Sequence, residues 1–378
     1  MAPHRYLILL YLKSGIMIKP NIHVERLEAY AITPQDVWSD MAPTDLLKID
    51  WNETPSELHF YQKELVRIAK KPGLIAWYPD CLALHLTDEI SKFVNVNSNF
   101  ILTFPGSDVG LETLCRAYLN SGDCVVALCP TYENFFVYVH QMGADLHKLV
   151  LDEPFKPDFA LISRKLETLD TVKMFYLANP NNPCGYSVAP EVIEQLAIQF
   201  PDTIFVVDEA YIEFTDTLSL APLVEKHPNI IVFRTFSKAF GMAGLRLGYM
   251  CAPIAINNTV NKIRNGKNIT MISQKLGIFA LQNFDLVSNW INEVIRSRVM
   301  FERWCVENGV IFFPSEGNFV LFKAGSPGEL CSALKAEGIY VRNRDSLVSG
   351  CVRVTMGSRS ETSQLNGALQ KFYRFLVF

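Results

Sequence analysis

Residues 230–249, IIVFRTFSKAFGMAGLRLGY, decide how the rest of the chain is interpreted. The stretch opens with four apolar residues of β-branched or aromatic type, a pattern typical of a buried parallel strand. Lys238 follows this run and is flanked by Phe236, Ala239 and Phe240, which predicts apolar surroundings for its amine. Such surroundings disfavour the ammonium form and leave a neutral amine that can attack an aldehyde. A lone lysine of this kind more often only extends from a buried turn to solvent, so the interpretation depends on the other motifs.

The length and charge of the chain limit its class. At 378 residues it exceeds what one hydrophobic core normally supports, which predicts two domains. The formal net charge is −4 and no basic block is present, so we expect neither nucleic acid nor a membrane as a partner. The nine cysteines are scattered without metal-ligand spacing, which favours free thiols in a cytoplasmic protein and no bound metal.

An apolar run at residues 6–12 follows His4 and Arg5 near the start of the chain. The run is too short to span a membrane and lacks the small-residue cleavage site of a signal peptide. Met17 begins a more ordinary N-terminal sequence. We therefore expect residues 1–16 to be dispensable or to result from an upstream start, and a deletion that abolishes folding would contradict this expectation.

Short apolar runs alternate with amphipathic segments between residues 100 and 251, as in an α/β domain with a largely parallel sheet. After about residue 255, long helical segments lead into a smaller α+β unit. We predict an N-terminal arm belonging partly to the small domain (1–50), a large domain (51–255) and a small C-terminal domain (256–378). The predicted strands are 46–51, 100–104, 124–129, 172–178, 204–207, 230–233, 247–251, 310–313, 319–323, 339–342 and 351–356. The predicted helices are 24–31, 57–69, 81–93, 111–119, 135–142, 191–199, 255–265, 273–283, 286–308 and 361–375.

Several predicted strands of the large domain end in polar residues or glycine. Ligands of open α/β sheets bind at the carboxyl ends of the strands, so these ends predict one shared pocket. The ends are Gly106-Ser107-Asp108, Pro130-Thr131-Tyr132, residues 179–182, residues 208–211 and Ser237-Lys238.

The chemistry of these ends fits pyridoxal 5′-phosphate, a cofactor that acts as an electron sink while the protein supplies geometry and charge. The cofactor's aldehyde needs an amine, which Lys238 supplies, and its ring nitrogen needs a carboxylate, which Asp208 supplies. The ring hydroxyl needs hydrogen-bond donors, for which Tyr211 and Asn182 are placed. Tyr132 is placed to stack on the ring.

The cofactor's phosphate needs amides at the start of a helix and a cation. Gly106, Ser107 and Asp108 precede a predicted helix, and Ser237 and Arg246 can complete the cradle. Taken singly, these features are explained as well by a salt-bridged strand end, a turn or a helix cap. Their joint occurrence in this order is what predicts the cofactor.

Four motifs resemble those of the class I/II aminotransferases: NPNNPCG (179–185), VVDEAYIEF (206–214), SKAFGMAGLRLGY (237–249) and RVTMGS (353–358). The chain resembles most the branch that contains histidinol-phosphate aminotransferase, from about residue 46 to residue 372. The resemblance implies a fold-type I enzyme with a largely parallel, seven-stranded-type sheet and a smaller α+β C-terminal domain.

The resemblance also implies roles for single residues. Lys238 would bond covalently to the cofactor aldehyde and carry protons, and Arg353 would bind the substrate carboxylate by a two-point contact. Tyr78 would reach the neighbouring subunit's site, because this family builds its sites across a homodimer interface. Arg342 and Tyr30 resemble residues that contact the phosphate of a phosphorylated substrate. The remaining implied cofactor contacts are Asp208, Asn182, Tyr211, Tyr132, Gly106, Ser107, Asp108, Ser237 and Arg246.

The reaction that this resemblance implies is transfer of an amino group, with glutamate as donor and imidazole acetol phosphate as an example of the acceptor. Three departures concern the substrate: Cys184 replaces a usual threonine, Val109 replaces a common glutamate, and residues 52–55 lack a glycine that often follows. Decarboxylation of a phosphorylated amino acid and transamination of another substrate, such as an aromatic amino acid, stay open. A regulatory role would require an added DNA-binding segment, which the sequence does not contain.

Overall fold

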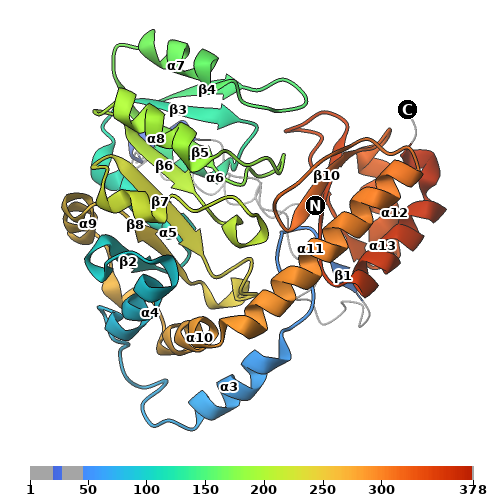
Figure 1. Cartoon of the computed structure of the whole chain (residues 1–378), viewed down its shortest axis with the longest axis horizontal. Coiled ribbons are helices and arrows are strands. Elements are labelled where there is room, and N and C mark those ends of the chain that lie inside the picture. The colour runs from blue at the N-terminus through green and yellow to red at the C-terminus, as the bar shows by residue number, and fades with distance from the viewer. Residues whose placement is uncertain (1–19, 28–45, 377–378) are drawn as a thin grey trace, which may run out of the picture.

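The computed structural model describes residues 20–27 and 46–376 (Figure 1). Tyr30 and residues 1–16, which carry predictions from the sequence, lie outside the described residues. Figure 1 shows a large sheet between helices and, beside it, a smaller group of strands and helices from the C-terminal part.

A seven-stranded sheet forms the centre of the larger group. Its strands are β2 (Ile101–Phe104), β3 (Cys124–Cys129), β4 (Asp145–Val150), β5 (Val172–Ala178), β6 (Ile204–Asp208), β7 (Ile230–Thr235) and β8 (Gly248–Cys251). They are ordered β2-β8-β7-β6-β5-β3-β4. The neighbours from β7 to β4 run parallel, whereas β8 is antiparallel to β2 and β7. The predicted α/β class and largely parallel sheet are confirmed.

Helices cover both faces of this sheet. The first face carries α5 (Ser107–Tyr118), α6 (Asn134–Gln141) and α9 (Ile254–Asn261). The second carries α4 (Leu84–Val94), α7 (Phe159–Glu167), α8 (Pro190–Gln199) and α10 (Met271–Gln282). Met174 and Tyr176 of β5 pack on the first face and Phe175 and Leu177 on the second. This alternation buries both sides of each strand and explains the apolar runs in the sequence.

The C-terminal group contains two small sheets. Its strands are β9 (Phe312–Phe313), β10 (Phe319–Lys323), β11 (Ile339–Tyr340), β12 (Arg342–Asn343) and β13 (Cys351–Thr355). Four of them form an antiparallel sheet in the order β12-β13-β10-β9, while β11 pairs in parallel with β1 (Leu47–Lys48). The helices are α11 (Phe284–Glu307), α12 (Pro327–Ala336) and α13 (Arg359–Lys371). The predicted domain boundaries stay predictions.

Two further helices precede α4 in the described part of the chain, α2 (Ile22–Glu25) and α3 (His59–Ala69). The 3-10 helices are η2 (Ser98–Phe100), η3 (Ile212–Phe214), η4 (Ala221–Glu225), η5 (Ala243–Leu245), η6 (Gly266–Asn268) and η7 (Tyr373–Phe375). Within the described ranges no helix is long and apolar enough to cross a membrane.

The structure adds one strand and two α-helices that the sequence did not predict, β4, α7 and α12, and it shortens other elements. Strand β4 was missed because it is an edge strand whose residues are mostly exposed, so it lacks a continuous apolar run. Helix α7 was also missed, although Asp158 caps it by accepting a hydrogen bond from the Leu161 N–H. The strand predicted at 46–51 is reduced to β1, and the one at 339–342 is divided into β11 and β12.

Candidate active site

Lys238 lies just beyond β7, at the carboxyl edge of the sheet. Its Nζ donates a hydrogen bond to the backbone oxygen of Trp51 at 2.9 Å and lies 6.0 Å from the centre of the Tyr211 ring. Desolvation lowers the pKa of Lys238 to about 8, although the nearby Glu53 carboxylate opposes the shift. A substantial fraction of this amine is therefore neutral near physiological pH, as a nucleophile requires.

Asp208 is the last residue of β6, the strand next to β7. Its Oδ2 accepts a hydrogen bond from the Tyr176 hydroxyl at 3.1 Å, and its Oδ1 accepts one from the Ala210 N–H at 3.2 Å. Burial, together with the nearby charge of Asp108, raises the pKa of Asp208 to about 7. A cationic group placed beside this buried carboxylate would stabilise its ionised form.

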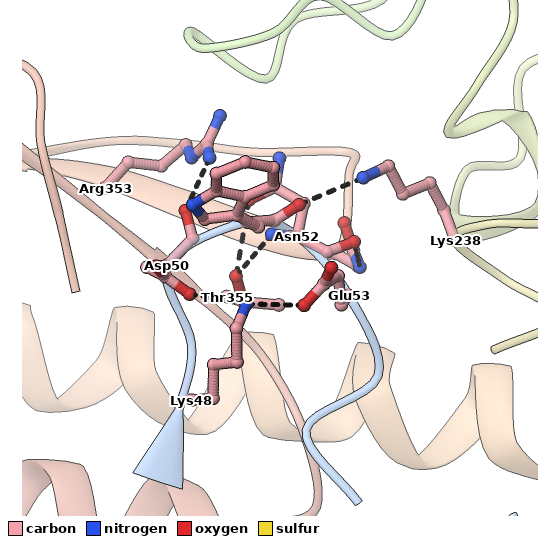
Figure 2. A network of polar contacts seen from close by, with 9 residues as sticks. Lys48, Asp50, Asn52, Glu53, Lys238, Arg353 and Thr355 are labelled. Atoms are coloured by element: carbon pink, nitrogen blue, oxygen red, sulfur yellow. Dashed lines mark hydrogen bonds and ion pairs between the residues drawn. The ribbon is translucent and has the colours of Figure 1, made fainter. Parts of the chain in front are cut away.

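Tyr211 belongs to a buried network that the sequence did not predict. The Tyr211 hydroxyl accepts a hydrogen bond from Asn52 Nδ2 at 3.0 Å. The Asn52 N–H donates to Thr355 Oγ1 at 2.9 Å, and the Asn52 backbone oxygen accepts from Asn318 Nδ2 at 3.1 Å. Figure 2 shows Asn52 and Thr355 beside Lys238 and Arg353. The segment after β1 thus joins the carboxyl edge of the large sheet to β13 and β10.

Asn52 has no role in the site predicted from the sequence. It has a φ of +55°, a left-handed conformation that asparagine tolerates better than most residues. The sequence signal that could have singled it out is a small polar residue directly after a short strand, but that pattern is common in turns.

Arg353, on β13, is buried and faces the same region. Its Nη1 donates to Asn182 Oδ1 at 2.6 Å. Its Nη2 donates to the backbone oxygen of Asp50 at 2.9 Å, as Figure 2 shows. Desolvation lowers the pKa of Arg353, and the charges of Arg344 and Arg342 lower it further. A cluster of cations that repel one another is a favourable place for an anion.

Trp51 lies between this cationic cluster and the lysine. The Cζ of Arg342 is 6.0 Å from the centre of the Trp51 ring, and Lys48 Nζ is 5.5 Å from it. Lys48 in turn pairs with Asp50 at 2.9 Å and with Glu53 at 2.5 Å (Figure 2). A molecule that contacts both Lys238 and Arg342 must therefore lie next to Trp51, a residue that the sequence did not single out.

The start of α5 forms the other end of the region. Gly106 caps this helix with a φ of +89°, and a Cβ added there would lie 2.6 Å from Nη2 of Arg246. A Cβ on Gly248 would lie 2.5 Å from the Ser107 nitrogen. Glycine at both positions keeps the helix N-terminus and a guanidinium close together, a geometry suited to phosphate.

Two other predicted cofactor contacts, Arg246 and Tyr132, lie beside Asp108 at the same helix start. Arg246 Nη2 is 3.7 Å from Asp108 Oδ2, and the Tyr132 hydroxyl donates to Asp108 Oδ1 at 2.8 Å. The Ser237 hydroxyl accepts a hydrogen bond from the Thr235 hydroxyl at 3.0 Å. The structure thus connects Asp108, Tyr132 and Arg246 directly.

Tyr78 is not joined to these residues within one chain. Its side chain is 79% exposed, and the described contact of its ring is with Lys267, whose Nζ lies 5.0 Å from the ring centre. Its role in a neighbouring subunit's site stays a prediction. Among residues 20–27 and 46–376, no group of three histidine, cysteine or acidic side chains is arranged to hold a metal.

Comparison with known proteins decides the family. Residues 48–372 match the family described as aminotransferase class I and II. The chain belongs to this family. It is 32% identical to a dihydroxyacetone phosphate transaminase of Campylobacter jejuni, over 94% of this chain and 97% of that protein. It is also 32% identical to a histidinol-phosphate aminotransferase of Bacteroides fragilis, over 94% of this chain and 98% of that protein.

A solved structure gives the same fold. The histidinol-phosphate aminotransferase of Sinorhizobium meliloti, in complex with pyridoxal 5′-phosphate, superposes with a TM-score of 0.85. The match covers 96% of this chain and all of that one at 24% identity. The predicted fold-type I architecture is therefore confirmed.

Members of this family are pyridoxal 5′-phosphate enzymes, so the predicted cofactor is confirmed at the level of the family. The residues present fit it. Lys238 has a desolvated amine, Asp208 has a buried carboxyl, and the absence of a Cβ at Gly106 lets Arg246 approach the helix start. These are the amine, the counter-charge and the phosphate cradle that the cofactor needs.

Proposed function

We propose that this aminotransferase moves an amino group from glutamate to a small ketone that carries a phosphate group. The observation that carries the proposal is the cluster of Arg353 and Arg342 beside Trp51, whose backbone oxygen contacts the Lys238 amine. Imidazole acetol phosphate and dihydroxyacetone phosphate both have a ketone next to a phosphorylated CH₂ group. A site with a reactive amine and an arginine cluster suits that shared part of both molecules.

The proposed roles follow from the contacts of each residue. Bound cofactor supplies the electron sink for the substrate's α-carbon. Lys238 Nζ removes the proton from that carbon, and the Asp208 carboxylate holds a proton on the ring nitrogen. Tyr211 and Asn182 would hold the ring hydroxyl of the cofactor, and Tyr132 would stack on its ring. The proposed phosphate contacts are the Gly106 segment, Ser107, Asp108, Ser237 and Arg246.

The arginines divide the recognition of substrates. Arg353 is buried and already oriented by Asn182 and Asp50, so we assign it to the carboxylate of glutamate. Arg342 lies further out, against Trp51, and we assign it to the phosphate of the acceptor. Tyr30 was predicted to share this phosphate and lies outside the described residues.

Arg342→Ala should lower kcat/KM for a phosphorylated amine or ketone by roughly 10- to 100-fold, because a charge-assisted contact worth on the order of 2–3 kcal/mol is lost. The half-reaction with glutamate should scarcely change, since its carboxylate rests on Arg353. Single-turnover rates with each substrate measure the two effects separately. Arg359→Ala, which removes an exposed arginine paired with Glu293 on α11, is the matched control.

An equal loss for both substrates would make Arg342 a structural residue. If the wild type turned over no phosphorylated substrate at all, the acceptor would be of another kind, such as an aromatic keto acid.

We also propose that the enzyme is a homodimer in which Tyr78 completes the partner's site. Support comes from a concentration of exposed apolar side chains on and beyond α3, where an interface would cover them. A monomer in sedimentation at micromolar concentration would refute the proposal. The exposed residues are Leu65, Val66, Ile75, Trp77, Tyr78, Leu82 and Leu84.

We further propose that the enzyme works in amino-acid biosynthesis in the cytoplasm. All nine cysteines lie in the described part of the chain, and each is a free thiol, which suits a reducing compartment. Fractionation of cells that express the tagged protein would show in which compartment it lies.

A further inference from the structure

Tyr176 lies directly behind Asp208 and has no role in the site as predicted from the sequence. It lies on β5, which runs parallel to β6 with Tyr176 opposite Val206, two residues before Asp208. Its side chain is fully buried, and its hydroxyl donates to Asp208 Oδ2 at 3.1 Å. A buried tyrosine hydroxyl is most stable when it has such a partner.

The Tyr176 ring is held in one position. It stacks on Phe135 of α6 with a centroid distance of 4.0 Å and an interplanar angle of 12°. The other carboxylate oxygen of Asp208 accepts from the Ala210 N–H. Hydrogen bonds to both oxygens fix the rotation of the Asp208 carboxylate, so its orientation toward the pocket is constant.

The charge of Asp208 depends on the same contacts. Burial and the Asp108 carboxylate on α5 raise its pKa, whereas the Tyr176 hydroxyl, the Ala210 N–H and the Lys238 amine lower it. Burial keeps the pKa of Tyr176 itself well above its ordinary value, so the phenol stays protonated and acts as the donor. Without this hydrogen bond, a carboxyl that titrates near neutral pH would be protonated more often.

We propose that Tyr176 is a positioning residue for the cofactor, because its hydroxyl holds the Asp208 carboxylate ionised and aimed at the ring nitrogen. The inference rests on the proposed role of Asp208. It gives a residue within β5 a role in cofactor binding, whereas the motifs at the strand ends do not include that residue. Cofactor uptake at neutral pH should depend on Tyr176.

The test uses Tyr176→Phe, which keeps the stack on Phe135 and removes only the hydroxyl. Cofactor-free protein is titrated with pyridoxal 5′-phosphate over a series of pH values, and the dissociation constant is followed by absorption. We expect the pH at which affinity is half-maximal to rise by about one unit, and affinity at about pH 7 to fall roughly tenfold. The matched control is Tyr249→Phe, since Tyr249 is equally buried and its hydroxyl has no hydrogen-bond partner in the described structure.

A second comparison separates this role from general stabilisation. In an Asp208→Asn background, adding Tyr176→Phe should leave cofactor affinity and its pH dependence unchanged, because no carboxylate remains to be ionised. The proposal would be overturned if Tyr176→Phe lowered cofactor affinity equally in the wild-type and Asp208→Asn proteins. It would also be overturned if Tyr176→Phe alone bound the cofactor as the wild type does.

If Tyr176→Phe does not fold, 3-fluorotyrosine introduced at position 176 alone replaces it. This more acidic phenol is a stronger donor and should lower the pH midpoint, and an unchanged midpoint would contradict the proposal. If wild-type protein takes up no pyridoxal 5′-phosphate at any pH, the proposed function itself fails. Wild-type uptake with an unaltered variant overturns the role of Tyr176 alone.

Discussion

Lys238→Ala should lower turnover by several orders of magnitude, the largest effect expected of any single substitution in this chain. We propose that this amine both anchors the cofactor and removes the α-proton, so the substitution should abolish two functions together. Steady-state kcat with glutamate and a phosphorylated ketone measures the loss. Borohydride treatment should fix the cofactor to the wild-type chain and not to the variant.

Lys262→Ala is the matched control, because Lys262 is an exposed lysine at the end of α9. This variant should retain wild-type turnover, and borohydride should fix the cofactor to it as to the wild type. If Lys238→Ala kept more than a small fraction of turnover, another group would supply the proton transfer, and the assignment of Lys238 would be wrong.

Asp208→Asn should keep the fold and, at a saturating concentration of pyridoxal 5′-phosphate, much of the bound cofactor, yet lower kcat on the order of 100-fold or more. The amide has nearly the shape of the carboxylate and can still accept the Tyr176 hydrogen bond, but it carries no charge to keep a ring nitrogen protonated. Rapid mixing with glutamate measures the half-reaction directly, because the absorption of the bound cofactor changes as the amino group is transferred.

The control for this substitution is Asp202→Asn, which alters an exposed carboxylate before β6. A near-normal rate in Asp208→Asn would show that the ring nitrogen does not require this charge. The role inferred for Tyr176 would then fail as well, because it acts through Asp208.

The ends of the buried strands could be predicted from the sequence because each apolar run stops at a polar residue. Lys238 and Asp208 follow β7 and end β6, and neighbouring parallel strands place them at one edge of the sheet. The edge strand β4 could not be predicted in this way, since exposure on both faces removes the apolar run that marks a strand.

The residues that surround this edge from elsewhere in the chain could not be predicted. Asn52 meets Tyr211 across 159 residues, and Trp51 meets Lys238 across 187, so only the folded arrangement brings them together. For Tyr176 the alternation of β5 predicts burial, but the partner of its hydroxyl depends on the pairing of β5 with β6. Local sequence contains no signal for such contacts.

The identity of the acceptor depends on contacts of the same non-local kind. Trp51 is far in sequence from Arg342 and Arg353, and the three residues form one wall beside the lysine. A guanidinium near Trp51 favours a phosphate, which both proposed acceptors carry. The two acceptors differ in the substituent on the other side of the ketone, which this wall does not contact. A comparison of kcat/KM for dihydroxyacetone phosphate and imidazole acetol phosphate would identify the preferred acceptor.

The most direct test of transamination is a single-turnover reaction of the cofactor-loaded protein with glutamate. We expect a stoichiometric amount of 2-oxoglutarate, no carbon dioxide, and a change in the absorption of the bound cofactor to that of its amine form. Adding dihydroxyacetone phosphate or imidazole acetol phosphate should then restore the original absorption. Failure of glutamate to produce 2-oxoglutarate and the amine form would contradict the proposed function, and release of carbon dioxide from a phosphorylated amino acid such as threonine phosphate would then favour a decarboxylase.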